Sequence, residues 1–208
     1  MSRLLHISAS PRGDRSASLT LARAFLDAYR EAAPGRVVDT FDLWDGTLPA
    51  FGSPAAAAKM AVFAGEEPVG EQADAWQAAR ETFERFDSYD RYLFSVPMWN
   101  AGVPYILKQF IDVVSQPGMV FAFDPEQGYT GLLRGKKAAV VYTGAVYGEG
   151  RGPAFGNDFQ RPFFEDWLRW AGITDVEAVE FRPNLVTADA DAGRRTALAR
   201  ARDLGKAF

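Results

Sequence analysis

Segments patterned like β-strands alternate with segments patterned like α-helices along this 208-residue chain. The expected strands cover residues 3–8, 36–43, 91–97, 136–144 and 175–181. The third of these, RYLFSVP, is almost continuously apolar, as is typical of a strand buried on both faces of a parallel sheet. Strands connected by helices form such a sheet with helices on both of its faces. The sequence therefore predicts an α/β fold with a doubly wound five-stranded parallel sheet, in a single domain over residues 1–208.

Apolar residues that recur every three to four positions mark the helices between these strands. The expected helices cover residues 16–33, 53–65, 76–86, 103–114, 157–171 and 188–206. In the second helix we expect Ser53 as the N-cap, Pro54 at the first helical position and Gly65 as the stop signal. A long connection over residues 44–72 surrounds that helix, and its role is open.

The composition narrows the chemistry that side chains can perform. The chain has no cysteine, which excludes disulfides and thiolate chemistry, and its one histidine, His6, leaves too few ligands for a typical transition-metal site. His6 lies in the first strand, where we expect a hydrogen-bonded core residue. The net charge of −4 argues against nucleic-acid binding, and no apolar run approaches the length of a membrane span. We expect a cytoplasmic protein whose chemistry is not carried by side chains.

In a doubly wound sheet, ligands bind beyond the carboxyl ends of the strands. Three loops follow strands at that edge, at residues 9–18, 97–102 and 143–150, and all are rich in Gly, Ser, Pro and aromatic residues. Their coincidence at one edge favours a binding site, although each loop alone has an ordinary structural interpretation.

The first loop, SASPRGDRSAS, leads into a helix that has no Asp or Glu in its first turn. Acidic residues are usually favoured there because the helix N-terminus is partly positive. The loop lacks the glycine patterns for dinucleotides and nucleoside triphosphates, so its serines and backbone N–H groups suit a terminal phosphate monoester. The alternative is that Ser16 only caps the helix and Ser10 only forms a turn.

The second and third loops offer groups that suit a planar heterocycle. Trp99 provides a flat surface and Asn100 both a donor and an acceptor, although Trp99 could instead pack at the rim of the core. In YTGAVYGEG, over residues 142–150, the glycines allow backbone N–H groups to approach a ligand, or form an ordinary turn.

Together, SASPRGDRSAS, PMWNAGVPYILKQFID and KKAAVVYTGAVYGEG make the sequence resemble the FMN-dependent NADH-azoreductases from residue 3 to about residue 182. This family consists of flavodoxin-like quinone and azo-compound reductases. The resemblance implies tightly bound, non-covalent FMN, with NADH or NADPH as the reductant. The cofactor-binding residues that it implies are Ser10, Ser16, Ala17 and Ser18 for the phosphate and ribityl chain, and Met98, Trp99, Asn100, Ala101, Thr143, Gly144, Ala145 and Val146 for the ring system.

Three positions depart from the family pattern. Trp99 replaces a tyrosine, Ala101 replaces a phenylalanine that shapes the flavin face, and the stretch 144–146 lacks an arginine. Trp99 keeps a flat wall, whereas Ala101 leaves the preferred substrate size open.

The resemblance implies that a quinone or azo compound is reduced in two-electron, ping-pong chemistry carried by the flavin, with no catalytic side chain. It also implies a homodimer with partner aromatics at each pocket. The candidates for that interface are Phe121, Phe123, Tyr129, Phe155, Phe159, Phe163 and Phe164.

Three other functions fit the sequence less well. A flavodoxin-type electron carrier should have an acidic face, whereas these loops contain Arg12, Arg15 and Arg151 beside Asp14 and Glu149. An ester hydrolase of the Gly-Asp-Ser type needs a late histidine, which the chain lacks. A phosphorylated receiver needs an acidic cluster after the first strand, and that is missing too.

Overall fold

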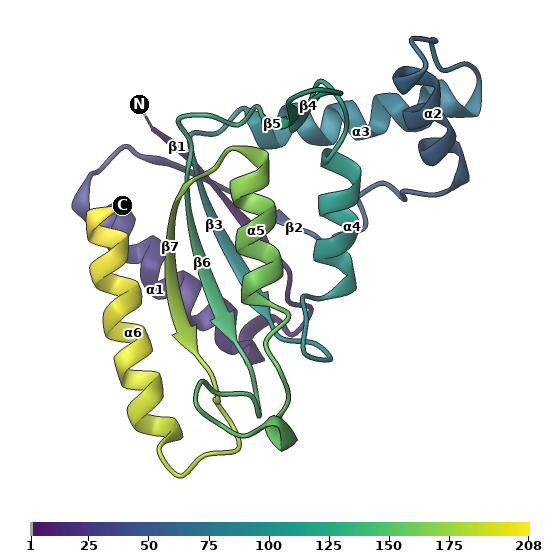
Figure 1. The fold of residues 1–208 in the computed structure, drawn as a ribbon. Helices are drawn as coiled ribbons and strands as arrows, with labels where there is room; N and C mark the ends of the chain where they lie inside the picture. Colours follow the sequence, from purple (N-terminus) through teal and green to yellow (C-terminus); the bar gives the residue numbers. More distant parts are fainter. Residues whose placement is uncertain (1) are drawn as a thin grey trace.

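The computed structural model describes residues 2–208, and its centre is a five-stranded parallel sheet with the order β2-β1-β3-β6-β7 (Figure 1). The strands are β1 (Arg3–Ser8), β2 (Val37–Asp42), β3 (Arg91–Pro97), β6 (Lys137–Thr143) and β7 (Asp175–Phe181). All four pairings between them are parallel. The predicted flavodoxin-like α/β class and its five strands are confirmed, and each strand lies within one residue of its expected bounds.

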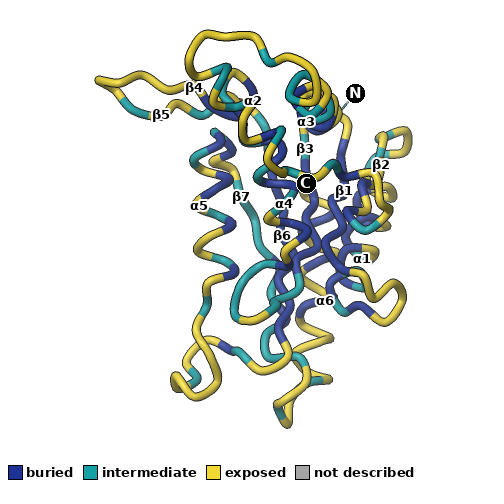
Figure 2. Tube along the Cα trace, turned by 90° about the vertical axis from the view of Figure 1, so that its right-hand side faces the viewer, coloured by how far each residue is buried: buried dark blue, intermediate teal, exposed yellow. Residues whose placement is uncertain are grey.

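Helices cover both faces of this sheet. Those on one face are α1 (Ala17–Ala32) and α6 (Ala190–Ala207), and those on the other are α3 (Glu71–Asp87), α4 (Tyr105–Val114) and α5 (Arg161–Ala171). Phe25 of α1 and Leu204 of α6 pack with Leu93 and Val141 of the sheet, while Phe94 packs into the core of the opposite face. The central strands are therefore buried on both sides, as Figure 2 shows.

The predicted start of α5 is wrong. A helix was expected from residue 157, but residues Pro153–Phe155 form a short 3-10 helix and α5 begins at Arg161. The Asp158 carboxylate accepts hydrogen bonds from the backbone N–H groups of Gln160, at 2.9 Å, and Arg161, at 3.0 Å. An aspartate in this role belongs just outside a helix, because it satisfies the N–H groups of the first turn.

The region between the second and third sheet strands contains α2 (Ser53–Phe63), whose N-cap is Gly52. The prediction of Ser53 as the cap is therefore wrong by one residue. The sequence reasoning also missed an antiparallel hairpin of β4 (Phe121–Asp124) and β5 (Gly128–Gly131). Figure 1 shows α2 and this hairpin at the end of the sheet where the strands begin, far from the loops considered above.

His6 is a buried core residue, as expected. Its Nε2 lies 2.7 Å from the hydroxyl oxygen of Ser95, with which it shares a hydrogen bond. Burial, with a smaller effect of the Arg30 charge, lowers the pKa of His6 from 6.5 to about 4. His6 is therefore neutral in the folded protein at neutral pH.

Within residues 2–208, none of the helices has the length and apolarity that crossing a membrane requires.

The close contact of α1 with α6 depends on Gly205. A Cβ atom at this position would overlap the backbone carbonyl of Phe25. We predict that Gly205→Ala lowers the free energy of unfolding by about 1–3 kcal/mol, because overpacking outweighs the better helix propensity of alanine. Gly193→Ala in the same helix is the control, since its Cβ meets only the edge of the Phe181 ring at 3.3 Å. Urea unfolding of both variants measures this, and equal effects would contradict the packing argument.

The lowered pKa of His6 makes stability depend on pH. From about pH 6.5 down to 4, the unfolded chain binds a proton that the folded chain excludes. The contribution of neutral His6 to the free energy of unfolding is therefore fully present above pH 6.5. As the pH falls, this contribution decreases by about 3 kcal/mol in all. We expect His6→Gln to lose less stability than the wild type between pH 7 and 4.5 in denaturant titrations. Parallel losses in the two proteins would show that His6 does not titrate in this way.

Candidate functional site

The three loops meet at the carboxyl edge of the sheet because their strands are parallel and adjacent. The N–H of Ala9 donates to the carbonyl of Ser95 at 3.1 Å, and the N–H of Met98 donates to the carbonyl of Thr143 at 2.6 Å. These bonds continue the pairing one residue beyond the strands and hold the loops at fixed distances from one another.

The first loop ends in a group of polar atoms with free hydrogen-bonding capacity. Ser16 caps α1, since its side chain accepts from the N–H of Leu19 at 3.3 Å, and its hydroxyl lies 3.0 Å from that of Ser18. Ser10, Ser16 and Ser18 are all buried. Among residues 2–208, the backbone N–H groups of Ala17 and Ser18 have no acceptor, as expected for the first turn of a helix. The cap interpretation of Ser16 holds, and the N-terminus still has donors available for an anion.

A cavity of about 340 Å³ opens beside this N-terminus, with Ser16 and Ala17 in its wall. The charged residues that also line it are Arg12, Asp14 and Arg15 of the first loop and Asp191 and Arg194 of α6. In the described part of the chain these three arginines form no ion pair, whereas Asp14 is paired with Arg23 at 2.7 Å. The cavity is therefore positive on balance and suits an anionic group.

The second loop is a tight turn with an unusual backbone. Trp99 and Gly102 exchange two backbone hydrogen bonds of 2.9 Å, and the two residues between them, Asn100 and Ala101, have φ of 49° and 67°. Positive φ at both central residues is the requirement of a type I′ turn, which glycine and asparagine meet easily and alanine does not. Backbone strain of this kind concentrates at functional sites.

Trp99 packs among other aromatic side chains. Its ring packs against Trp44, with centroids 5.8 Å apart, and against Tyr105 at 6.2 Å. The structure thus places Trp99 in a half-buried aromatic cluster, as in the packing alternative considered for it.

The third loop offers a second pair of free donors. Thr143 and Gly144 are buried, and the carbonyls of Gly144 and Ala145 accept hydrogen bonds from residues 184–186. The N–H groups of Ala145 and Val146 have no acceptor within the 207 residues from 2 to 208. They belong to exposed residues, so they remain accessible to a ligand.

A second cavity, of about 200 Å³, connects the second and third loops. Five of the predicted site residues line it, namely Met98, Asn100, Ala101, Ala145 and Val146. Trp99, Thr143 and Gly144 lie outside this lining. Ser16 and Ala17 line the first cavity, while Ser10 and Ser18 are buried and do not line it.

Sequence reasoning missed several lining residues. Arg194 borders the first cavity, and Phe155, Gly156 and Asn157 form a third wall of the second. Phe155 is among the aromatics expected at the interface with a second copy. No sequence pattern indicates the segment 155–157 as a wall of a cavity in the same chain, because a helix is expected from residue 157. Tyr147 could have been found, since it lies in a loop already selected by its position after a strand.

The sequence pattern of the family described as "Flavodoxin-like fold" matches residues 2–204. An FMN-dependent NADH:quinone oxidoreductase of Ruegeria pomeroyi is 47% identical over 199 residues, which cover 96% of this chain and 98% of that protein. The chain belongs to this family of flavodoxin-like oxidoreductases. The resemblance inferred from the three loop motifs is thereby confirmed.

A second relative and a solved structure match this chain over their whole length. A protein of the same name from Nitratidesulfovibrio vulgaris is 42% identical over 211 residues, with complete coverage of both chains. The crystal structure of an azoreductase from Bacillus anthracis superposes with a TM-score of 0.90 at 26% identity, again with complete coverage of both chains. The three-loop edge described above therefore belongs to a fold shared along the entire chain.

The strained turn gives a prediction for stability. We expect Ala101→Gly to raise the free energy of unfolding by about 0.5–1 kcal/mol, because relief of the left-handed backbone exceeds the entropic cost of glycine. Asn100→Gly is the control. It should change the free energy of unfolding by only a small fraction of the change in Ala101→Gly, since asparagine tolerates positive φ. Thermal and urea unfolding report the difference; a loss of stability in Ala101→Gly would contradict the strain.

Proposed function

We propose that this protein is an FMN-dependent NADH:quinone oxidoreductase that also accepts azo compounds. The observation that carries the proposal is the acid-free, serine-lined N-terminus of α1 at the same sheet edge as a cavity with free backbone donors. The names of the relatives from Ruegeria pomeroyi and Nitratidesulfovibrio vulgaris, and of the azoreductase neighbour, support it.

The residues present fit FMN at both ends. A phosphate monoester carries about −1.5 to −2 charge and several acceptor oxygens, which the N–H groups of Ala17 and Ser18 and the hydroxyls of Ser10 and Ser16 would bind. The ring system would occupy the cavity between the second and third loops, against Met98. The free N–H groups of Ala17 and Ser18 need acceptors, which the phosphate oxygens would supply.

When bound, FMN supplies hydride acceptance from NADH or NADPH and two-electron transfer to the acceptor. The protein contributes binding, orientation and charge stabilisation. We propose that the N–H groups of Ala145 and Val146 donate to the pyrimidine edge of the ring, where negative charge develops on reduction. No side chain needs to transfer a proton there, in agreement with the burial of the sole histidine.

One opening serves both reactants in this proposal. With the flavin ring in the second cavity, the one exposed face of the ring would receive the nicotinamide and the acceptor in turn. The nicotinamide would therefore leave before a quinone or azo compound binds, which is the order that ping-pong kinetics requires. Ala101 has a short side chain at this opening, which favours bulky acceptors.

The remaining expectations concern the whole molecule. We propose a single-domain cytoplasmic enzyme that acts as a homodimer and does not bind nucleic acid or membranes. Of the candidate interface aromatics, Phe121 and Phe164 are core residues, whereas the others are exposed. The exposed ones are Phe123, Tyr129, Phe155, Phe159 and Phe163. These five support a surface that a second copy could cover.

An anaerobic absorbance titration of the FMN-loaded protein with NADH tests the proposed function. Bleaching of the flavin band by NADH, and its recovery when a quinone is added, is the expected result. Bound flavin that neither NADH nor NADPH bleaches would instead favour an electron carrier that serves a protein partner. A protein that does not bind FMN would contradict both functions.

A carboxylate at the start of α1 should separate phosphate binding from helix stability. We predict that Ala17→Asp weakens FMN binding by more than 100-fold, because the new charge repels the phosphate. The same change should stabilise the FMN-free helix by about 0.3–1 kcal/mol through the helix dipole. Fluorescence titration of FMN and thermal unfolding of the FMN-free protein measure the two effects. Ala17→Asn is the uncharged control, and unchanged FMN affinity in Ala17→Asp would place the phosphate elsewhere.

A further inference from the structure

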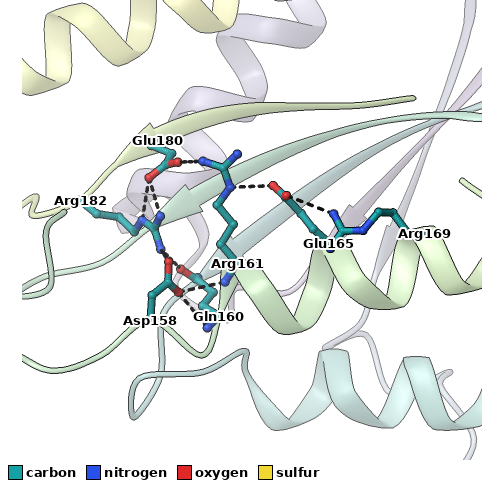
Figure 3. Close-up of polar contacts among 7 residues, drawn as sticks. All are labelled: Asp158, Gln160, Arg161, Glu165, Arg169, Glu180 and Arg182. Atoms are coloured by element: carbon teal, nitrogen blue, oxygen red, sulfur yellow. Dashed lines mark hydrogen bonds and ion pairs between the residues drawn. The ribbon is translucent and has the colours of Figure 1, made fainter. Parts of the chain in front are cut away.

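A buried arginine connects the segments that line the second cavity. Arg182 directly follows β7, and its side chain is only 3% exposed. Its Nη1 donates to Asp158 Oδ2 at 2.8 Å and to Gln160 Oε1 at 3.2 Å, and its Nε donates to Glu180 Oε2 at 3.1 Å. Figure 3 shows the guanidinium enclosed between these three side chains.

Arginines and carboxylates alternate through the surrounding network. Arg161 pairs with both Glu180 and Glu165, and Arg169 pairs with Glu165. Three arginines thus face four carboxylates, since Asp158 pairs with Arg182 and Asp166 pairs with Arg169. These pairs hold the segments that carry them in fixed positions. Buried ion pairs add little net stability compared with apolar residues, which leaves geometry as their main contribution.

The network connects to both loops of the second cavity. On one side, the N–H of Phe159, next to Asp158, donates to the carbonyl of Ala101 at 2.9 Å, and Gln160 Nε2 donates to the carbonyl of Val96 at 2.8 Å. These bonds hold the strained turn of the second loop. Asp158 also directly follows the segment 155–157, which forms the third wall.

On the other side, Arg182 supports the third loop. Its guanidinium lies 5.1 Å from the centroid of the Tyr147 ring, and a Cβ on Gly144 would touch its side chain at 3.4 Å. Arg182 is therefore in contact with the loop that provides the free N–H groups of Ala145 and Val146, and with the segment opposite it.

We propose that Arg182, paired with Asp158, is a positioning residue that fixes the three walls of the second cavity relative to one another. The assignment rests on the proposed function, because the cavity is where the flavin ring and its reactants would meet. Arg182 would contact neither the flavin ring nor the reactants. It acts through the third loop and through the segment 155–159. Its loss should loosen the opening for the reactants and leave the phosphate end of the site, at α1, unchanged.

The test uses the double variant Arg182→Met with Asp158→Asn. It removes both charges of this pair together, so that neither is left buried without its partner. Arg200→Met combined with Glu177→Gln is the matched control, since it removes an exposed ion pair of 2.7 Å that also involves β7. Arg182→Lys keeps the charge without the planar fork and provides a milder change if the double variant folds poorly.

The first readout is hydrogen exchange on the protein as purified, which does not depend on activity. We expect exchange over residues 144–159 to become at least tenfold faster in the double variant, and less so in Arg182→Lys. Residues 10–19 and the control variant should exchange as in the wild type. Unchanged exchange over 144–159 would overturn the proposal.

The second readout is steady-state kinetics with NADH and a benzoquinone. We expect KM for both reactants to rise at least fivefold in the double variant, while the dissociation constant of FMN changes less than threefold. Faster exchange with unchanged KM values would show a purely structural ion pair and overturn the assignment. If the wild type is not reduced by NADH at all, the proposed function fails, and the exchange data still decide whether Arg182 positions the loops.

Discussion

Burial of a parallel sheet on both faces is the constraint on which the site depends. Each chain connection must cross a face of the sheet and return to its amino end, so every strand ends at the same edge. The register aligns Ser8 with Ser95 and Pro97 with Thr143, and this alignment brings the three loops together. The α1 N-terminus opens at that edge because the first loop is short.

The distribution of charge follows from the same edge. A helix N-terminus without Asp or Glu gives up a favourable contribution of about 0.3–1 kcal/mol, and Arg12 and Arg15 make the region more positive still. A bound phosphate restores that contribution with a larger charge. The folded protein without its ligand is therefore less stable at this point than it could be, which is common where a structure is built for binding.

Much of the fold was predictable because local signals and tertiary structure agree. Of the sheet strands, β1, β3 and β6 are mostly apolar runs, while β2 and β7 alternate apolar with polar residues. Each of the five lies within a residue of its expected bounds. The failures occur where distant contacts decide the local structure. Asp158 fits a helical pattern in sequence, but its carboxylate caps α5 and pairs with Arg182, 24 residues later, so the helix begins only at Arg161. The β4–β5 hairpin was missed because its strands have four residues each, too few to show an alternating pattern.

The candidate site was predictable in the same uneven way. Position after a strand identified all three loops, and composition identified the serines of the first. The orientation of Trp99 was not decided by the sequence, since its contact with Trp44 joins segments 55 residues apart, and the third wall at residues 155–157 depends on the distant Arg182 pair. Long-range contacts of this kind leave no periodic trace in the chain.

The central claim is that a phosphate occupies the N-terminus of α1. The most direct measurement compares the dissociation constants of FMN and riboflavin for the unmodified protein at low salt. These two flavins differ only in the phosphate group, so the comparison isolates that group. The account predicts that FMN binds at least about 100-fold more tightly, because two or more charge-assisted hydrogen bonds are each worth about 1.5–3 kcal/mol. Equal affinities for the two flavins would contradict it.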